Sequence, residues 1–150
     1  ALSGGQQRCV ALAGVLSMRQ SVLVLDEPMA GLDPRGREHV RALLQDLKKQ
    51  GTALLVVTHS MDDVAELADH VVILDHGRVV ADGTPREVFT TRADALESIG
   101  IPSAQAFAER LAGMGLSFAA SSANAAENIP LTIDELAASL TEVLPHGAAR

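Results

Sequence analysis

VLVLDEPMAGLD, residues 22–33, carries the strongest signal for the fold class of this chain. A short apolar run of this kind is typical of a strand buried on both faces of a parallel sheet, and we predict such a strand over Ser21–Asp26. Asp26 and Glu27 stand where the strand ends, at the edge where ligands bind in open parallel sheets. Adjacent carboxylates point to different sides of a strand, so the two can take different tasks.

Helix and strand signals alternate on both sides of this strand. Ser3 can cap a helix that extends to about Ser17, and Pro34 suits the first turn of a helix that reaches Gln50 and stops at Gly51. The other predicted elements are a buried strand over Thr52–Thr58, a helix over Met61–Ala68, a third strand over His70–Leu74, a hairpin turn at Asp75–Arg78, a fourth strand over Val79–Ala81 and a short helix over Pro85–Phe89. The alternation predicts an α/β fold with a mainly parallel sheet.

The character of the sequence changes after about Thr91, where alanine-rich helical segments replace the alternation. We predict helices over Ser103–Ala112 and Thr132–Leu144, the second begun by a capping box of Thr132 with Glu135. The small, polar residues 117–128 between them are typical of an exposed loop or a disordered segment. The chain is therefore predicted to have two domains, residues 1–90 with the α/β pattern and residues 91–150 as a helical extension.

Composition and charge exclude several classes of function. A net charge of −7 without a long basic stretch disfavours nucleic-acid binding, and an aromatic content of 2% removes the stacking platforms that bases need. The apolar runs are too short to cross a bilayer, so we expect membrane association only through a partner. The sole cysteine, Cys9, can form no internal disulfide, and we predict that it is a small buried residue on the first helix.

Two further positions suit phosphate chemistry. Ser3, Gly4 and Gly5 at a helix start present backbone N–H groups and the positive end of the helix dipole to an anion, without a Cβ in the way. On their own these residues are more often a turn or an ordinary cap. His59 follows the second predicted strand at its carboxyl end, although a lone histidine is usually structural or merely exposed. The spacing of the histidines and the cysteine suggests no metal cluster.

In this order and spacing, these features together resemble the ATPase subunit of an ATP-binding-cassette (ABC) transporter. The resemblance identifies Leu2–Gln6 as the signature motif, Val22–Asp26 as the Walker B strand, Glu27 as the catalytic glutamate, Ala30–Asp33 as the D-loop and His59 as the switch histidine. It implies the C-terminal part of a P-loop NTPase domain, which has a RecA-like fold with a mainly parallel sheet, followed by a small α-helical extension.

The same resemblance implies a role for each of these residues, with ATP and Mg²⁺ as cofactors. Glu27 would polarise the attacking water, His59 would act beside it on the γ-phosphate, and Asp26 would hold Mg²⁺ through water. Asp33 would lie at the interface of an ATPase dimer and couple its two sites. The ATP held by the opposite subunit would be contacted by the signature residues Ser3, Gly4, Gly5 and Gln6.

A phosphate-binding loop of the form Gly-x-x-x-x-Gly-Lys-[Ser/Thr] does not occur in the 150 residues, and Lys48 and Lys49 are the only lysines. We therefore expect a portion of a longer ATPase, in which hydrolysis belongs to the full-length protein and this chain alone is inactive. The alternative is a truncated or degenerate cassette that does not hydrolyse ATP and acts only by subunit interaction. ABC-type ATPases outside transport are disfavoured, because long coiled coils and basic surfaces are missing from this sequence.

The tail resembles the C-terminal extension of energy-coupling-factor ATPases, in ALESIGIP at residues 95–102 and LTIDEL at residues 131–136. That resemblance implies the import of a metal ion or vitamin. The partners would be a second ABC ATPase subunit, in a homo- or heterodimer, and a transmembrane coupling subunit. The protein would be peripheral, at the cytoplasmic face of the cell membrane. The transported substrate is chosen by other subunits and cannot be deduced from these residues.

Overall fold

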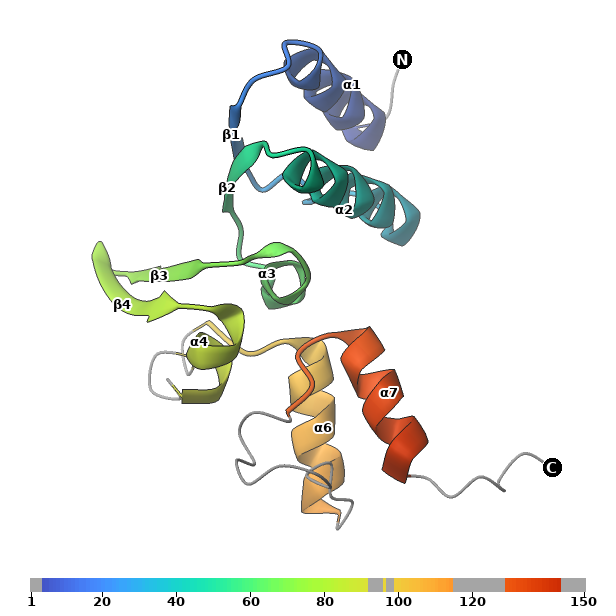
Figure 1. Cartoon of the computed structure of the whole chain (residues 1–150), viewed down its shortest axis with the longest axis vertical. Coiled ribbons are helices and arrows are strands. Elements are labelled where there is room, and N and C mark those ends of the chain that lie inside the picture. The colour runs from blue at the N-terminus through green and yellow to red at the C-terminus, as the bar shows by residue number, and fades with distance from the viewer. Residues whose placement is uncertain (1–3, 92–95, 97–98, 115–128, 144–150) are drawn as a thin grey trace, which may run out of the picture. The chain divides into compact units, whose positions relative to one another are not determined.

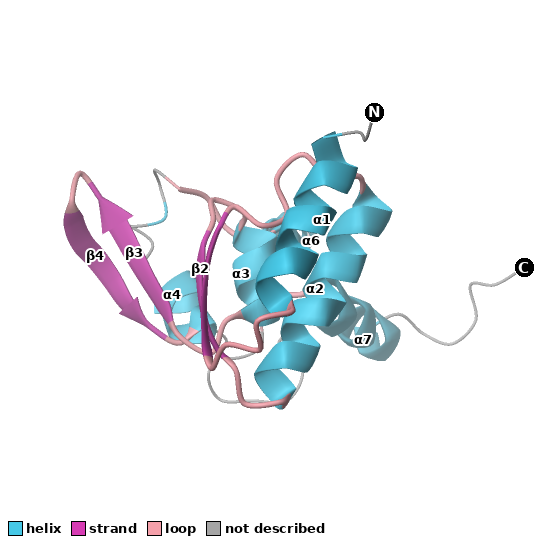
Figure 2. Ribbon diagram, turned by 90° about the horizontal axis from the view of Figure 1, so that it is seen from above, coloured by secondary structure: helices cyan, strands magenta, loops and turns pink. Residues whose placement is uncertain are grey.

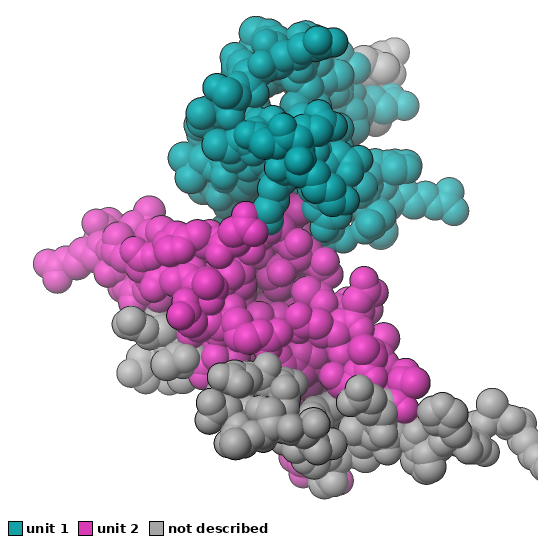
Figure 3. All heavy atoms as spheres, in the orientation of Figure 1, with its two compact units in different colours: residues 1–59 teal, residues 60–150 magenta. Residues whose placement is uncertain are grey.

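Paired strands flanked by helices make up the computed structural model, which describes residues 4–91, 96, 99–114 and 129–143 (Figure 1). Within these residues the strands form two separate two-stranded sheets. The chain divides into two compact units, residues 1–59 and residues 60–150 (Figure 3). The domain boundary after residue 90 stays a prediction. The alternation of helices with strands, one pair of which is parallel, confirms the predicted α/β class.

The first unit is built around a parallel strand pair. Its elements are α1 (Gly4–Leu16), β1 (Val22–Asp26), α2 (Pro34–Lys49) and β2 (Ala53–Val57). β1 pairs with β2 along its whole length, ending with Asp26 opposite Val57. The pairing continues one residue further, because the backbone N–H of Glu27 donates to the carbonyl oxygen of Val57 at 2.8 Å. The carboxyl ends of the two strands therefore meet at one edge of the sheet.

Helix α2 begins and ends where the local signals predict. The carboxylate of Asp33 caps its first turn by accepting a hydrogen bond from the backbone N–H of Gly36 at 2.8 Å, and Pro34 occupies its first position. Gly51, with a φ of +89°, follows its last turn in a conformation that favours glycine. The helix buries the side chains of Val40 and Leu44.

The prediction that β1 and β2 are buried on both faces is wrong. In β1 only Leu23 is buried, whereas Val22 and Val24 are 57% and 63% exposed. In β2 the side chains of Leu55 and Val57 are similarly exposed. Helices α1 and α2 lie on one side of this strand pair (Figure 2), and the described residues of the first unit supply no layer on the other side. Burial depends on such a second layer, which the apolar composition of a strand does not reveal.

The helix predicted from Ser3 to about Ser17 is present as α1, but the burial predicted for Cys9 on it is not. Every residue of α1 whose burial is described is exposed or half-buried. Cys9 is exposed, so the prediction of a buried cysteine is wrong. The reason is the same as for the strands, because one stripe of a helix becomes a core only where another element covers it.

The second unit contains an antiparallel hairpin and four helices within its described residues. These elements are α3 (Met61–Leu67), β3 (Val71–Asp75), β4 (Arg78–Gly83), α4 (Pro85–Thr91), α6 (Ser103–Gly113) and α7 (Ile133–Val143). β3 and β4 pair antiparallel (Figure 2). His76 and Gly77 form the turn with φ values of +46° and +74°, the positive values that a two-residue type I′ hairpin needs. The predicted hairpin is confirmed.

The core of the second unit lies between the hairpin and the helices. Its buried residues are Val71, Ile73, Ala81, Val88, Phe89, Leu96 and Leu131. A smaller cluster of Ala104, Ala108 and Leu136 joins α6 to α7. The buried amide of Gln105 donates from Nε2 to the carbonyl oxygen of Phe89 at 3.0 Å, which ties α6 to α4.

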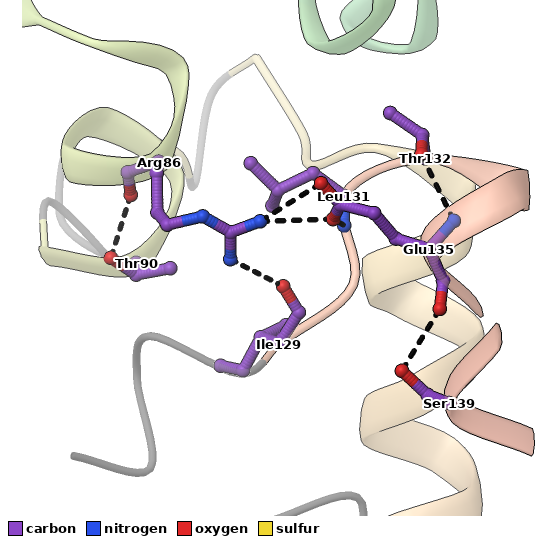
Figure 4. Close-up of polar contacts among 7 residues, drawn as sticks. All are labelled: Arg86, Thr90, Ile129, Leu131, Thr132, Glu135 and Ser139. Atoms are coloured by element: carbon purple, nitrogen blue, oxygen red, sulfur yellow. Dashed lines mark hydrogen bonds and ion pairs between the residues drawn. The ribbon is translucent and has the colours of Figure 1, made fainter. Parts of the chain in front are cut away.

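Arg86 connects α4 to the start of α7 (Figure 4). Its guanidinium donates from Nη2 to both carboxylate oxygens of Glu135, at 3.0 and 2.9 Å, and from Nη1 to the carbonyl oxygen of Ile129 at 2.9 Å. Glu135 also takes part in the predicted capping box, since its backbone N–H donates to the Thr132 hydroxyl at 3.2 Å. The return bond to the Glu135 carboxylate comes from the backbone N–H of Leu131, one residue earlier than a standard box requires. The predicted loop over residues 117–128 lies outside the described residues.

Candidate functional site

Glu27 leaves β1 with a backbone conformation that residues other than glycine seldom adopt. Its φ is +47°, in the left-handed region. Such a conformation costs about 1–3 kcal/mol and persists only where the surroundings hold it. The backbone of Glu27 is held by the hydrogen bond from its N–H to the Val57 carbonyl, and its side chain is held by its own hydrogen bonds.

The carboxylate of Glu27 accepts hydrogen bonds from the two residues that follow β2. Oε1 lies 2.5 Å from Nδ1 of the His59 ring and 2.9 Å from the backbone nitrogen of His59, whose N–H donates to it. Oε2 accepts from the hydroxyl of Thr58 at 3.3 Å. The catalytic pair predicted from the sequence, Glu27 and His59, is therefore in direct contact at the carboxyl edge of the parallel strands.

These contacts set the charge state of Glu27. Partial burial raises the pKa of the Glu27 carboxyl. This effect is outweighed by hydrogen bonds from the His59 ring and the His59 backbone N–H, by the charge of that ring, and by the hydrogen bond from the Thr58 hydroxyl. The net result is a Glu27 pKa below the ordinary glutamate value, so the carboxylate is ionised at neutral pH. An ionised, oriented carboxylate is suited to accept a proton from water.

Asp26 ends β1 with an exposed side chain, away from the hydrogen bonds that join Glu27 to His59. Among the described residues no three histidine, cysteine or carboxylate side chains are grouped so that they could hold a metal ion. Mg²⁺ commonly uses one or two carboxylates and completes its shell with water and phosphate oxygens, so the exposed Asp26 carboxylate fits that ion as a single ligand.

The predicted signature residues lie at the start of helix α1. Ser3 lies outside the described residues, while Gly4, Gly5 and Gln6 form the first turn. A Cβ placed on Gly4 would meet open space, so a ligand can approach the backbone there. A Cβ on Gly5 would lie 3.3 Å from Cδ2 of Leu32, so the start of α1 packs against the segment that precedes α2. That segment includes the predicted D-loop.

Asp33 has a structural contact that its predicted role did not include. Its carboxylate caps α2 through Gly36. A role at a subunit interface remains a prediction for this residue. The described part of the structure does not bring Asp33 into hydrogen-bond contact with Glu27 or His59.

A hollow of about 460 Å³ lies in the first unit, lined by the end of α1, the end of α2 and the amino ends of the strands. Its lining residues are Val15, Leu16, Arg19, Gln20, Leu23, Leu47, Gln50 and Thr52. None of the predicted site residues is among them. Asp26, Glu27, Asp33 and His59 lie at or beyond the carboxyl ends of the strands, and Gly4, Gly5 and Gln6 lie at the opposite end of α1 from the hollow.

Thr58 is the site residue that the sequence did not single out. Its only signal was its position directly before His59, and a threonine at the end of a strand is common. The register of β1 with β2 sets Glu27 beside Thr58, although the two residues are 31 positions apart.

Comparisons with known proteins show what this chain is similar to. Residues 1–62 match the family described as "AAA domain, putative AbiEii toxin, Type IV TA system". The energy-coupling factor transporter ATP-binding protein EcfA2 of Latilactobacillus sakei is 47% identical, in an alignment that covers 98% of this chain and 48% of that protein. The protein of the same name from Enterococcus faecalis is 49% identical, over 91% of this chain and 45% of its own length.

A solved structure also resembles this chain. It is cbiO1 from Clostridium perfringens, described as part of the ABC transporter complex cbiONQ. It matches with a TM-score of 0.56 and 38% identity, over 77% of this chain and 43% of its own length.

These comparisons confirm the predicted resemblance to the ATPases of ABC transporters. Within that class, the relatives are ATP-binding proteins of energy-coupling-factor transporters. The chain spans about half the length of the curated relatives that it matches. No helix within the described residues is both long enough and apolar enough to cross a bilayer.

Proposed function

We propose that this chain supplies the Walker B, D-loop, switch-histidine and signature elements of an energy-coupling-factor ATPase that hydrolyses ATP to drive import. The observation that carries the proposal is the contact of Glu27 with His59 at 2.5 Å, at the carboxyl ends of paired parallel strands. Catalytic groups of open parallel sheets are expected at that edge. The relatives, named as transporter ATP-binding proteins, support the same assignment.

Glu27 acts as the general base in this proposal. Its ionised carboxylate accepts the proton of the attacking water, and His59 and Thr58 keep that carboxylate oriented. His59, with 84% of its side chain exposed, is free to contact a phosphate oxygen while its Nδ1 stays on Glu27. Bound Mg²⁺, held by Asp26, would neutralise the charge that develops on the phosphates.

The signature residues serve a second subunit. The start of α1, where Gly4 and Gln6 are exposed and Gly5 is half-buried, offers backbone N–H groups to the nucleotide of the opposite ATPase, and Ser3 adds a hydroxyl. The dimer is formed with a second ABC ATPase, and Asp33 lies at its interface. The whole assembly is held at the cytoplasmic face of the membrane by a transmembrane coupling subunit. Its substrate is a metal ion or a vitamin.

The experiment is Glu27→Gln in the complete ATPase subunit that carries this sequence, assembled with its partner. Glutamine keeps the shape of the side chain and removes the base, so ATP turnover should fall on the order of 10²–10⁴-fold while ATP binding is retained. The variant should also accumulate as a closed dimer with ATP in size-exclusion chromatography. Turnover within a few-fold of wild type contradicts the assignment. A wild-type assembly without turnover favours the non-hydrolysing cassette instead.

A further inference from the structure

The Glu27 carboxylate is held at both of its oxygens, and the two oxygens have different donors. Oε1 takes both bonds from His59, whereas Oε2 takes the bond from the Thr58 hydroxyl. A carboxylate held at one oxygen can still rotate about that contact. The second donor removes this rotation and sets the plane of the carboxylate.

The backbone explains why Thr58 is the residue placed at Oε2. The bond from the Glu27 N–H to the Val57 carbonyl extends the β1–β2 ladder beyond Asp26, so Thr58 is the next residue across from Glu27. The left-handed φ of Glu27 then turns its side chain towards β2. The side chain of Thr58 is half-buried, which shields this hydrogen bond from competing water.

We propose that Thr58 is a positioning residue for the catalytic step, its hydroxyl fixing Oε2 of Glu27 while His59 fixes Oε1. This inference rests on the proposed function of Glu27 as the base. The chemical step depends steeply on the orientation of the base, whereas ATP binding does not involve this carboxylate. Loss of the hydroxyl should therefore lower kcat and leave KM for ATP unchanged.

The test compares three variants in the complete ATPase subunit with its partner. Thr58→Val keeps the shape but removes the hydroxyl, and kcat should fall about tenfold, equivalent to about 1.4 kcal/mol. Thr58→Ser restores a hydroxyl and should stay within about twofold of wild type in kcat. The matched control is Thr52→Val, the same substitution just before the other end of β2, which should leave both constants unchanged.

A second arm separates positioning from a general effect on the fold. In the Glu27→Gln background Thr58→Val should cause no further loss in the single-turnover rate, because there is no base left to position. An equal loss in both backgrounds overturns the proposal, and so does a Thr58→Ser variant as slow as Thr58→Val. Thr58→Ala removes the same hydroxyl with a smaller side chain, and loss of ATP binding in both Thr58→Val and Thr58→Ala also overturns the proposal.

A third arm does not need hydrolysis, so it distinguishes failure of this inference from failure of the proposed function. The ¹³C resonance of the Glu27 carboxyl carbon reports its hydrogen bonds directly. It should move in Thr58→Val and return towards the wild-type position in Thr58→Ser, with no change in Thr52→Val. A Glu27 resonance that is the same in Thr58→Val as in wild type overturns the proposal, even where the wild-type assembly turns over no ATP.

Discussion

The carboxylate of Asp62, on α3, caps helix α6 by accepting two hydrogen bonds from Ser103. The Ser103 backbone N–H donates to Oδ1 at 2.6 Å and the Ser103 hydroxyl donates to Oδ2 at 2.8 Å. The residue at the cap position of α6 itself is Pro102, which makes no side-chain cap. A helix of the tail therefore depends for its first turn on a residue that follows His59 by only three positions.

Replacing Asp62 should destabilise this part of the fold. Asp62→Ala removes an N-terminal cap, whose loss costs about 1 kcal/mol. Urea unfolding of the complete subunit, followed by circular dichroism, measures the change in free energy. Ser103→Ala removes one of the two bonds and should cost less. The double variant should cost no more than Asp62→Ala alone, and full additivity of the two effects would show that the two residues act independently.

Replacing Gly5 by aspartate should block ATP-driven dimerisation of the complete subunit. The new side chain would press on Leu32, since a Cβ at this position already lies 3.3 Å from it, and its charge would repel the phosphates of the partner's nucleotide. Size exclusion with ATP measures the dimer. Gly14→Asp is the matched control on the same helix, where a Cβ meets nothing within 4 Å. Loss of nucleotide binding by the same subunit would mean that the signature motif acts in cis.

The Glu87 carboxylate should make stability depend on pH. The backbone N–H of Thr84 and then its hydroxyl, each at 2.8 Å, lower the Glu87 pKa below its ordinary value of 4.5. A lowered folded-state pKa stabilises the fold above the unfolded pKa, and this stabilisation is lost as pH falls through the folded value. Wild type should therefore be more stable than Glu87→Gln at pH 7, and the difference should shrink below pH 4.5. A difference that stays constant in urea titrations from neutral to acidic pH would exclude this origin.

Residues 1–150 alone should show no measurable ATPase activity and at most very weak nucleotide binding, because they contain no phosphate-binding loop. They should also associate, since side chains such as Val24 and Leu55 are 63% and 58% exposed on the strands. Isothermal titration with ATP and Mg²⁺ and sedimentation of the purified chain measure both effects. A micromolar dissociation constant would place the nucleotide site elsewhere.

Most element boundaries could be predicted from the sequence, because the interactions that set them span only a few residues. Pro34 and the Asp33 cap start α2, Gly51 ends it, and His76 with Gly77 closes the hairpin. Burial could not be predicted in the same way. Val22 and Val24 are as apolar as core residues, yet they are exposed, because a second layer and not a strand's own composition decides what is buried.

The order of the helices and strands, and the positions of Glu27 and His59 after two of the strands, follow from local sequence signals alone. Folding adds the contact between these two side chains, the hydrogen bond from the Thr58 hydroxyl to Glu27, and the cap that Asp62 makes on a helix 41 residues away. The physical reason is the range of the interactions involved. Caps and turns are made between close neighbours in the chain, whereas the register of β1 with β2 and the left-handed turn at Glu27 arise only when distant segments pair.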